Sequence, residues 1–165
     1  MYKVGIITAS DKGFSGKRED LSGPTIEQIV LQNPSFVMER YTMVPDEHHI
    51  LANEMMNMAD REGIDLILTT GGTGFSNRDV TPEATLEIID KRTPGISEAI
   101  RLKSLSITER AMLSRAEAGI RGETLIVNLP GSPKAISEVL AYILPSIVHG
   151  LDVLKGSSTD CARDE

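Results

Sequence analysis

The sequence has one cysteine, no tryptophan and only three tyrosines and three phenylalanines among its 165 residues. Cys161 lies in a polar stretch near the C-terminal end, so neither an intrachain disulfide nor a site built from several thiolates can form. Long hydrophobic runs are also missing at the N-terminal end, where the apolar residues 4–7 are far too few for a signal peptide or a membrane span. We therefore expect a cytoplasmic protein with no membrane partner.

Positive charge is scarce as well. The chain has 17 Lys and Arg against 24 Asp and Glu, which gives a formal net charge of −7, and no basic cluster of nucleic-acid length appears. Nucleic acid is therefore a poor candidate partner. An anionic ligand could still bind, but only in a built pocket that supplies backbone N–H groups, a few basic side chains or a bridging metal ion.

The length of the chain is typical of one domain, whose folding buries roughly 70% of the unfolded surface. Neither internal repeats nor low-complexity tracts interrupt it. We expect one domain over residues 1–155, followed by a flexible polar tail over residues 156–165.

Short apolar runs bounded by turn residues predict the strands of a mostly parallel sheet. These runs alternate with helical patterns, which is typical of a three-layer α/β/α fold. Residues 116–121 could add a strand in a hairpin, because residues 121–123 form a plausible turn. The predicted strands are 4–8, 37–43, 65–69 and 124–128, and the predicted helices are 24–32, 47–62, 82–89, 95–105 and 133–154.

Three of these helices are predicted to begin at a proline, where the missing N–H costs nothing. The prolines are Pro24, Pro82 and Pro133, and a capping hydroxyl or a glycine stands next to each. Each helix follows a strand through a loop rich in Gly, Ser, Thr or Asp. Because the carboxyl ends of parallel strands meet at one edge of the sheet, we expect a ligand to bind there.

The loop Gly71-Gly72-Thr73-Gly74 is a candidate phosphate cradle at this edge. It follows a predicted buried strand and precedes a helix, so its backbone can approach a ligand closely and aim N–H groups at an anion. A bare tight turn remains the alternative. The chain has no Gly-x-x-x-x-Gly-Lys-[Ser/Thr] run and no Gly-x-Gly-x-x-Gly after its first strand, which argues against a P-loop and a dinucleotide fingerprint.

Three aspartates stand beside the same edge. Asp79 lies between the glycine loop and the next helix, where it could bind a metal or cap the helix N-terminus. Asp46 follows the strand at 37–43, and taken alone it fits a helix N-cap better than a metal ligand. Asp11 follows the first strand, in a segment too polar and too rich in glycine to be regular, which is either a ligand-closing loop or a solvated surface loop. The histidines lack metal-ligand spacing and are predicted to be structural or surface residues: His48, His49 and His149.

Four stretches of the chain form a more specific pattern when they are taken together and in order. They are Ser10-Asp11 with residues 18–24 (REDLSGP), residues 69–74 (TTGGTG) with 78–84 (RDVTPEA), residues 113–115 (LSR) with 118–122 (AGIRG), and residues 128–135 (NLPGSPKA). From about residue 2 to about residue 154 the chain thereby resembles the molybdopterin-binding Mog/MoaB family. The tail lies outside the resemblance.

The resemblance implies a three-layer α/β domain that assembles as a homotrimer and transfers AMP from ATP to the terminal phosphate of molybdopterin. The reaction would require Mg²⁺ and release pyrophosphate, and a molybdate-insertion protein of the same pathway is an implied partner. Asp46 and Asp79 would be catalytic and would hold the Mg²⁺, which overrides the preference for a cap at Asp46, while Ser114 would act around the pterin phosphate. The substrate-binding residues implied are Ser10, Asp11, Gly71, Gly72, Thr73, Gly74, Pro130, Gly131, Ser132 and Pro133.

Such a reaction needs a metal for a physical reason. Two polyanions must be held together while negative charge builds up on the departing pyrophosphate, and Mg²⁺ with oriented hydrogen-bond donors offsets that charge. Three other functions remain as alternatives: a paralogue that binds or carries molybdopterin with weak catalysis, a scaffold built on the trimeric domain, and a nucleotide-handling enzyme similar to the competence-associated family. The presence of both Asp46 and Asp79 disfavours the first, and the other two would need domains that we do not expect here.

Overall fold

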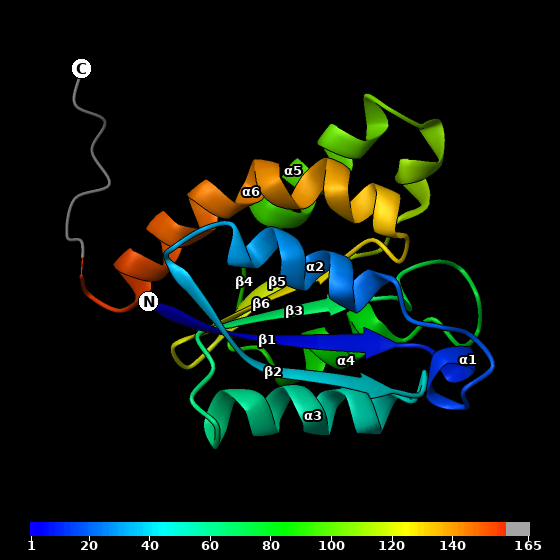
Figure 1. Ribbon diagram of the computed structural model, residues 1–165, viewed down its shortest axis with the longest axis horizontal. Coiled ribbons are helices and arrows are strands. Elements are labelled where there is room, and N and C mark those ends of the chain that lie inside the picture. Colours follow the sequence, from blue (N-terminus) through cyan, green and yellow to red (C-terminus); the bar gives the residue numbers. More distant parts are fainter. Residues whose placement is uncertain (158–165) are drawn as a thin grey trace.

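The computed structural model describes residues 1–157, which form a six-stranded sheet between two layers of helices (Figure 1). The strands are β1 (Tyr2–Ala9), β2 (Phe36–Val44), β3 (Leu66–Thr70), β4 (Lys91–Arg92), β5 (Ala118–Arg121) and β6 (Thr124–Leu129). The helices are α1 (Asp11–Phe14), α2 (Ser22–Leu31), α3 (His48–Asp60), α4 (Thr81–Ile88), α5 (Pro94–Leu105), the 3₁₀ helix η1 (Glu109–Leu113) and α6 (Pro133–Leu154).

The strand order is β2-β1-β3-β6-β5-β4. β1 pairs in parallel with β2 and β3, and β3 pairs in parallel with β6, whereas β5 is antiparallel to both β6 and β4. The predicted three-layer α/β/α fold with a mostly parallel sheet is therefore confirmed. The chain moves from β1 to β2 on one side and then to β3 on the other, so the carboxyl ends of β1 and β3 form a topological switch point, where ligands of such sheets bind.

Two apolar cores lie on the two faces of the sheet because side chains alternate along each strand. Val4 and Ile6 of β1 face α2, α5 and α6, whereas Ile7 of β1 and Ile67 of β3 face α3 and α4. Figure 1 shows these two helical layers above and below the strands, with α1 beyond the carboxyl end of β1. By length and composition α6 could cross a membrane, but its apolar side packs against α2, α5 and β6, which accounts for it as a core helix.

The predicted strands and helices are all present, with ends that shift by one or two residues. The hairpin of β5 and β6 is also present, and its turn contains Gly122 at φ 55°, a left-handed conformation that favours glycine. The two-residue strand β4 and the 3₁₀ helix η1 were not predicted, because each is too short to produce a periodic pattern. The last helix, α6, ends at Leu154, and most of the predicted flexible tail, from residue 158 onward, lies outside the described residues.

Two local predictions were wrong. The segment after β1 is not wholly irregular, because Asp11–Phe14 forms one helical turn that the side chain of Ser10 caps by accepting a hydrogen bond from the Gly13 N–H at 3.0 Å. Pro133 does begin α6, but Pro82 is the second residue of α4 and Pro24 the third residue of α2. Proline is tolerated at all three places because the first N–H groups of a helix have no partner within it.

Candidate active site

The loops that follow β1, β3 and β6 meet at the carboxyl edge of the sheet and enclose a cavity of about 500 Å³. We call it the carboxylate cavity. The charged residues that line it are four acids and one arginine, so the cavity has an excess of negative charge. The predicted site residues that line it are Ser10, Asp46, Gly71, Gly72, Asp79, Gly131, Ser132 and Pro133.

Asp46 lies in the turn between β2 and α3, and its carboxylate does not cap the helix. The residue at the helix start is Glu47, which makes no side-chain cap. Instead the Asp11 N–H donates to Asp46 Oδ2 at 2.8 Å, and the Asp46 N–H donates back to Asp11 Oδ1 at 3.0 Å. Burial raises the pKa of the Asp46 carboxyl above its ordinary value, and the charges of Asp11 and Asp79 add to the rise. The ionised form of Asp46 is therefore poorly compensated in the folded chain.

Asp79 is not a helix cap either. Its Oδ2 accepts from the Ser76 N–H at 2.8 Å, and its own N–H donates to the Ser76 carbonyl at 2.9 Å, so the aspartate closes a tight turn within the loop. The first residue before α4 is Val80, which provides no side-chain cap. Asp79 also lies close enough to Asp46 for its charge to raise the pKa of that carboxyl.

Asp11 does not line the carboxylate cavity but holds its wall in place. Its carboxylate accepts two hydrogen bonds from the Arg78 guanidinium, from Nε and Nη2 at 3.0 Å each, and Arg78 Nη2 also donates to Glu47 Oε1 at 2.8 Å. These hydrogen bonds hold the pKa of Asp11 below its usual range. Arg78 thereby connects the loop after β3 to α1 and to the start of α3, around Asp46.

The glycine loop is shaped by close backbone packing. Gly71 and Gly72 have φ values of 89° and 65°, and a Cβ on Gly71 would lie 2.2 Å from the carbonyl oxygen of Ala9. Thr81 at the start of α4 holds the loop in place. Its Oγ1 donates to the Gly71 carbonyl at 2.9 Å, and its N–H donates to the Gly72 carbonyl at 3.1 Å. Within residues 1–157, the backbone N–H groups at 72–74 make no hydrogen bond. A phosphate cradle would bind an anion through N–H groups of this kind.

A second cavity of about 270 Å³ adjoins the first, and we call it the serine cavity. Ser114 lines it where η1 ends, together with Thr73, Gly74 and Pro130, while Gly131 lines both cavities. The predicted site residues other than Asp11 therefore line two adjacent cavities, whereas Asp11 lines neither. Two arginines, Arg101 and Arg110, also line the serine cavity.

Sequence reasoning missed several residues at this edge, of which Asp20 is the most connected. It accepts hydrogen bonds from Thr8 Oγ1 at 2.8 Å and from the Tyr41 hydroxyl at 2.5 Å, and it caps α2 through the Ser22 N–H at 2.8 Å. Burial alone would raise the pKa of Asp20, but these hydrogen bonds lower it below its ordinary value. Burial and the neighbouring Asp20 raise the pKa of Tyr41 to about 12. The position of Asp20, two residues before a helix start, was the signal that could have identified it as a cap.

The two paired aspartates fit a magnesium ion that is shared with a substrate. No group of three or more His, Cys, Asp or Glu within the described part of the chain is placed to hold a metal by itself. Asp46 and Asp79 each use only Oδ2 in hydrogen bonds to described residues, so Oδ1 of each is available. Mg²⁺ binds through one or two carboxylates together with phosphate oxygens and waters, which matches this arrangement.

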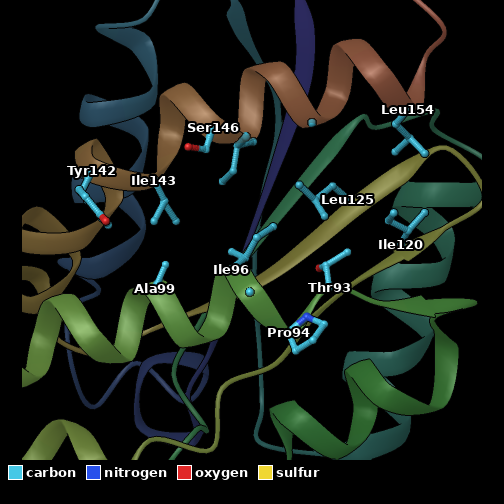
Figure 2. Close-up of a pocket in the computed structure, with 13 residues that line it drawn as sticks. Thr93, Pro94, Ile96, Ala99, Ile120, Leu125, Tyr142, Ile143, Ser146 and Leu154 are labelled. Atoms are coloured by element: carbon cyan, nitrogen blue, oxygen red, sulfur yellow. The ribbon is translucent and has the colours of Figure 1, made fainter. Parts of the chain in front are cut away.

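A third cavity, of about 480 Å³, contains none of the predicted site residues. Figure 2 shows it between α5 and α6, where Ile96, Ile143 and Leu125 point into it. Its lining is mainly apolar, unlike that of the carboxylate cavity. None of the three histidines lines the carboxylate cavity or the serine cavity: His49 and His149 are exposed, and His48 Nε2 lies 3.1 Å from Glu87 Oε2.

The switch point, the open glycine loop and the paired carboxylates define an α/β protein suited to a phosphate-bearing ligand and a divalent cation. Comparison with known proteins specifies the class further. Residues 5–149 match the family described as a probable molybdopterin binding domain.

Individual relatives agree with that match. The molybdopterin adenylyltransferase of Helicobacter pylori strain J99 is 41% identical over 157 residues, which cover 93% of this chain and 88% of the relative. The crystal structure of the molybdopterin biosynthesis enzyme MoaB from Thermus thermophilus has a TM-score of 0.89 and 49% identity, covering 94% of this chain and 98% of the other. The tungsten cofactor synthesizing protein MoaB from Pyrococcus furiosus has a TM-score of 0.84 and 35% identity, with coverages of 94% and 98%. The chain therefore belongs to the molybdopterin-binding domain family of Mog and MoaB proteins, as the sequence motifs indicated.

Proposed function

We propose that this chain is a molybdopterin adenylyltransferase, which transfers AMP from ATP to the terminal phosphate of molybdopterin and releases pyrophosphate. The observation that carries the proposal is the pairing of Asp46 and Asp79 at one cavity beside the open amides of the glycine loop. Relatives that bear the name of this activity, from Helicobacter pylori and Escherichia coli, are 41% and 38% identical over most of the chain.

In the reaction an oxygen of the molybdopterin phosphate attacks the α-phosphorus of ATP. A new P–O bond forms as the bond from the α-phosphorus to the oxygen bridging to the β-phosphorus breaks, and that bond's electrons leave with pyrophosphate. The glycine-loop N–H groups bind phosphate oxygens and orient the two substrates for this displacement. Mg²⁺, when bound by Asp46 and Asp79, supplies positive charge that offsets the charge on the phosphates.

The two cavities suit two substrates that must react with each other. They adjoin at Gly131, and the glycine loop spans them, since Gly71 and Gly72 line one and Thr73 and Gly74 the other. Ser114 in the serine cavity acts around the molybdopterin phosphate, while the carboxylates stand at the nucleotide phosphates. The homotrimer, the cytoplasmic location and the molybdate-insertion partner form part of this proposal through family membership.

The test is to incubate the purified protein with molybdopterin and ATP labelled at the α-phosphate, with Mg²⁺ or with excess EDTA. We expect a labelled, adenylylated pterin and an equal amount of pyrophosphate, only with Mg²⁺ and only with molybdopterin. Binding of molybdopterin without any labelled pterin would instead identify a carrier. ATP hydrolysis at the same rate without pterin would contradict the proposed reaction.

A further inference from the structure

Arg115 makes an unusual set of contacts with the loop between β3 and α4. Its Nε donates to the Gly74 carbonyl at 2.7 Å and its Nη2 to the Asp79 carbonyl at 2.6 Å, while Nη1 pairs with the Glu83 carboxylate. One guanidinium therefore binds both ends of the segment 74–79 and the first turn of α4. This segment contains Asp79 and Arg78, whose side chains face Asp46 and Asp11.

The backbone of Arg115 adds a second connection. Its N–H donates to the Thr73 carbonyl at 3.0 Å, so the residue next to Ser114 is hydrogen-bonded to the glycine loop through main chain and side chain alike. Ser114 lines the serine cavity and Asp79 lines the carboxylate cavity. Arg115 is thus one connection between residues that line the two cavities.

We propose that Arg115 is a positioning residue for adenylyl transfer: it fixes Asp79 relative to Ser114 without contacting the reacting atoms. This inference rests on the proposed function. In the folded chain all three guanidinium nitrogens are used by protein acceptors, two carbonyls and one carboxylate. Arg115 itself lines neither cavity, so its effect must pass through the loop that it holds.

A lysine cannot replace this arginine. The guanidinium is a planar fork whose nitrogens reach three acceptors in different directions, whereas an ammonium is a point charge on a flexible stem. The variant Arg115→Lys keeps the charge but releases at least one end of the segment 74–79. A displacement near 1 Å at such a site can reduce the rate on the order of a hundredfold.

Arg121, the last residue of β5, offers a matched control. Its guanidinium also binds a carbonyl and a carboxylate, donating to Ile88 at 2.7 Å and to Asp60 at 2.9 and 2.7 Å, and its side chain is 25% exposed against 33% for Arg115. Arg121 lines neither the carboxylate cavity nor the serine cavity. The variant Arg121→Lys therefore removes equivalent contacts at a place remote from the site.

The experiment compares Arg115→Lys and Arg121→Lys with the unaltered full chain in three measurements. The first is hydrogen exchange at residues 72–80 in the protein without substrates, the second is kcat and KM for adenylyl transfer, and the third is the melting temperature. In addition, Arg115→Ala and Arg121→Ala are assayed with added ethylguanidinium, which can reoccupy the place of a missing guanidinium.

For Arg115→Lys we expect faster exchange over 72–80, a kcat lowered on the order of a hundredfold and KM values within about threefold. We expect ethylguanidinium to restore part of the rate of Arg115→Ala and to leave the rate of Arg121→Ala unchanged. Unchanged loop exchange, a loss confined to KM, or an equal loss of kcat in Arg121→Lys would each overturn the inference. If the unaltered protein forms no adenylylated pterin, the proposed function fails, while the exchange measurement still decides whether Arg115 fixes the loop.

Discussion

The substitution Asp46→Asn distinguishes two possible roles of the Asp46 carboxylate: acting on the substrates, or only shaping the turn before α3. Asn keeps an amide oxygen that can accept the Asp11 N–H, the hydrogen bond that Asp46 Oδ2 accepts at 2.8 Å. It also removes a partly buried negative charge, whose pKa is raised by burial and further by the charges of Asp11 and Asp79. We therefore expect the free energy of unfolding to change by less than about 1 kcal/mol, with any change toward greater stability.

The effect on turnover should be much larger. If Asp46 helps to hold Mg²⁺ against the transferred phosphoryl group, the neutral amide removes transition-state stabilisation of roughly 3 kcal/mol, which is on the order of a hundredfold in rate. Molybdopterin binding should persist, because Ser114 in the serine cavity is untouched. The control is Asp90→Asn, since Asp90 also accepts a backbone N–H, from Gly122 at 2.7 Å, but lines neither site cavity.

The assay is single-turnover adenylylation with saturating molybdopterin and MgATP, beside a denaturant melt of each variant. Lost turnover together with retained fold and retained pterin binding is the expected result for Asp46→Asn, and normal behaviour is expected for Asp90→Asn. Turnover in Asp46→Asn within about twofold of the unaltered protein would falsify the metal assignment, because a metal ligand cannot be neutralised at so small a cost.

Three further predictions concern the same edge of the sheet. In Gly74→Ala the new Cβ would lie 2.9 Å from Asp79 Oδ2, so we expect kcat to fall roughly tenfold or more, whereas Gly150→Ala, with open space around its Cβ, should leave kcat unchanged. In Ser114→Ala we expect KM for molybdopterin to rise about tenfold while KM for ATP stays constant, in steady-state assays, since one hydrogen bond near the pterin phosphate is lost. Folding lowers the pKa of Asp20, so the ionised carboxylate stabilises the folded protein at any pH above the pKa that Asp20 has in the unfolded chain. This stabilisation is lost as the pH falls through the lower pKa that Asp20 has in the folded protein. Chemical denaturation should therefore show Asp20→Asn to be less stable by about 1–3 kcal/mol at pH 7, with a difference that shrinks below pH 4; a constant difference would contradict the linkage.

Much of the fold could be predicted from the sequence because its central strands are buried on both faces. β1, β3 and β6 are short apolar runs between turn residues, the pattern typical of parallel strands buried on both faces. The edge of the sheet at which the candidate site lies could be predicted from the same pattern, since parallel strands bring their carboxyl ends together. The motifs at 71–74 and 130–133 therefore lie side by side, and a Cβ added to Gly131 would lie 3.6 Å from the Cα of Gly71.

The parts that could not be predicted depend on contacts between residues distant in sequence. Asp46 looked like a helix cap because it precedes α3, and only the fold brings Asp11 to its carboxylate from 35 residues away. Arg115 belongs to the motif at 113–115, but the motif gave no sign of its contacts, because its partners Gly74 and Asp79 lie 41 and 36 residues earlier. The division of the site into two cavities depends in turn on where η1 ends, and η1 has no periodic pattern to reveal it.

The excess of acids around the carboxylate cavity has a physical consequence for the order of events. Arg18 is the one cation in the lining, against four acids, and Arg78, outside the lining, already has three hydrogen bonds to Asp11 and Glu47. A bare nucleotide polyphosphate would therefore meet Asp46 and Asp79 as like charges, and its entry would cost free energy. The same polyphosphate with a bound Mg²⁺ presents a positive centre to those carboxylates and lowers the repulsion between them. We therefore expect the metal to enter together with the nucleotide, which would relieve the repulsion from Asp11 and Asp79 that adds to the effect of burial on the pKa of Asp46.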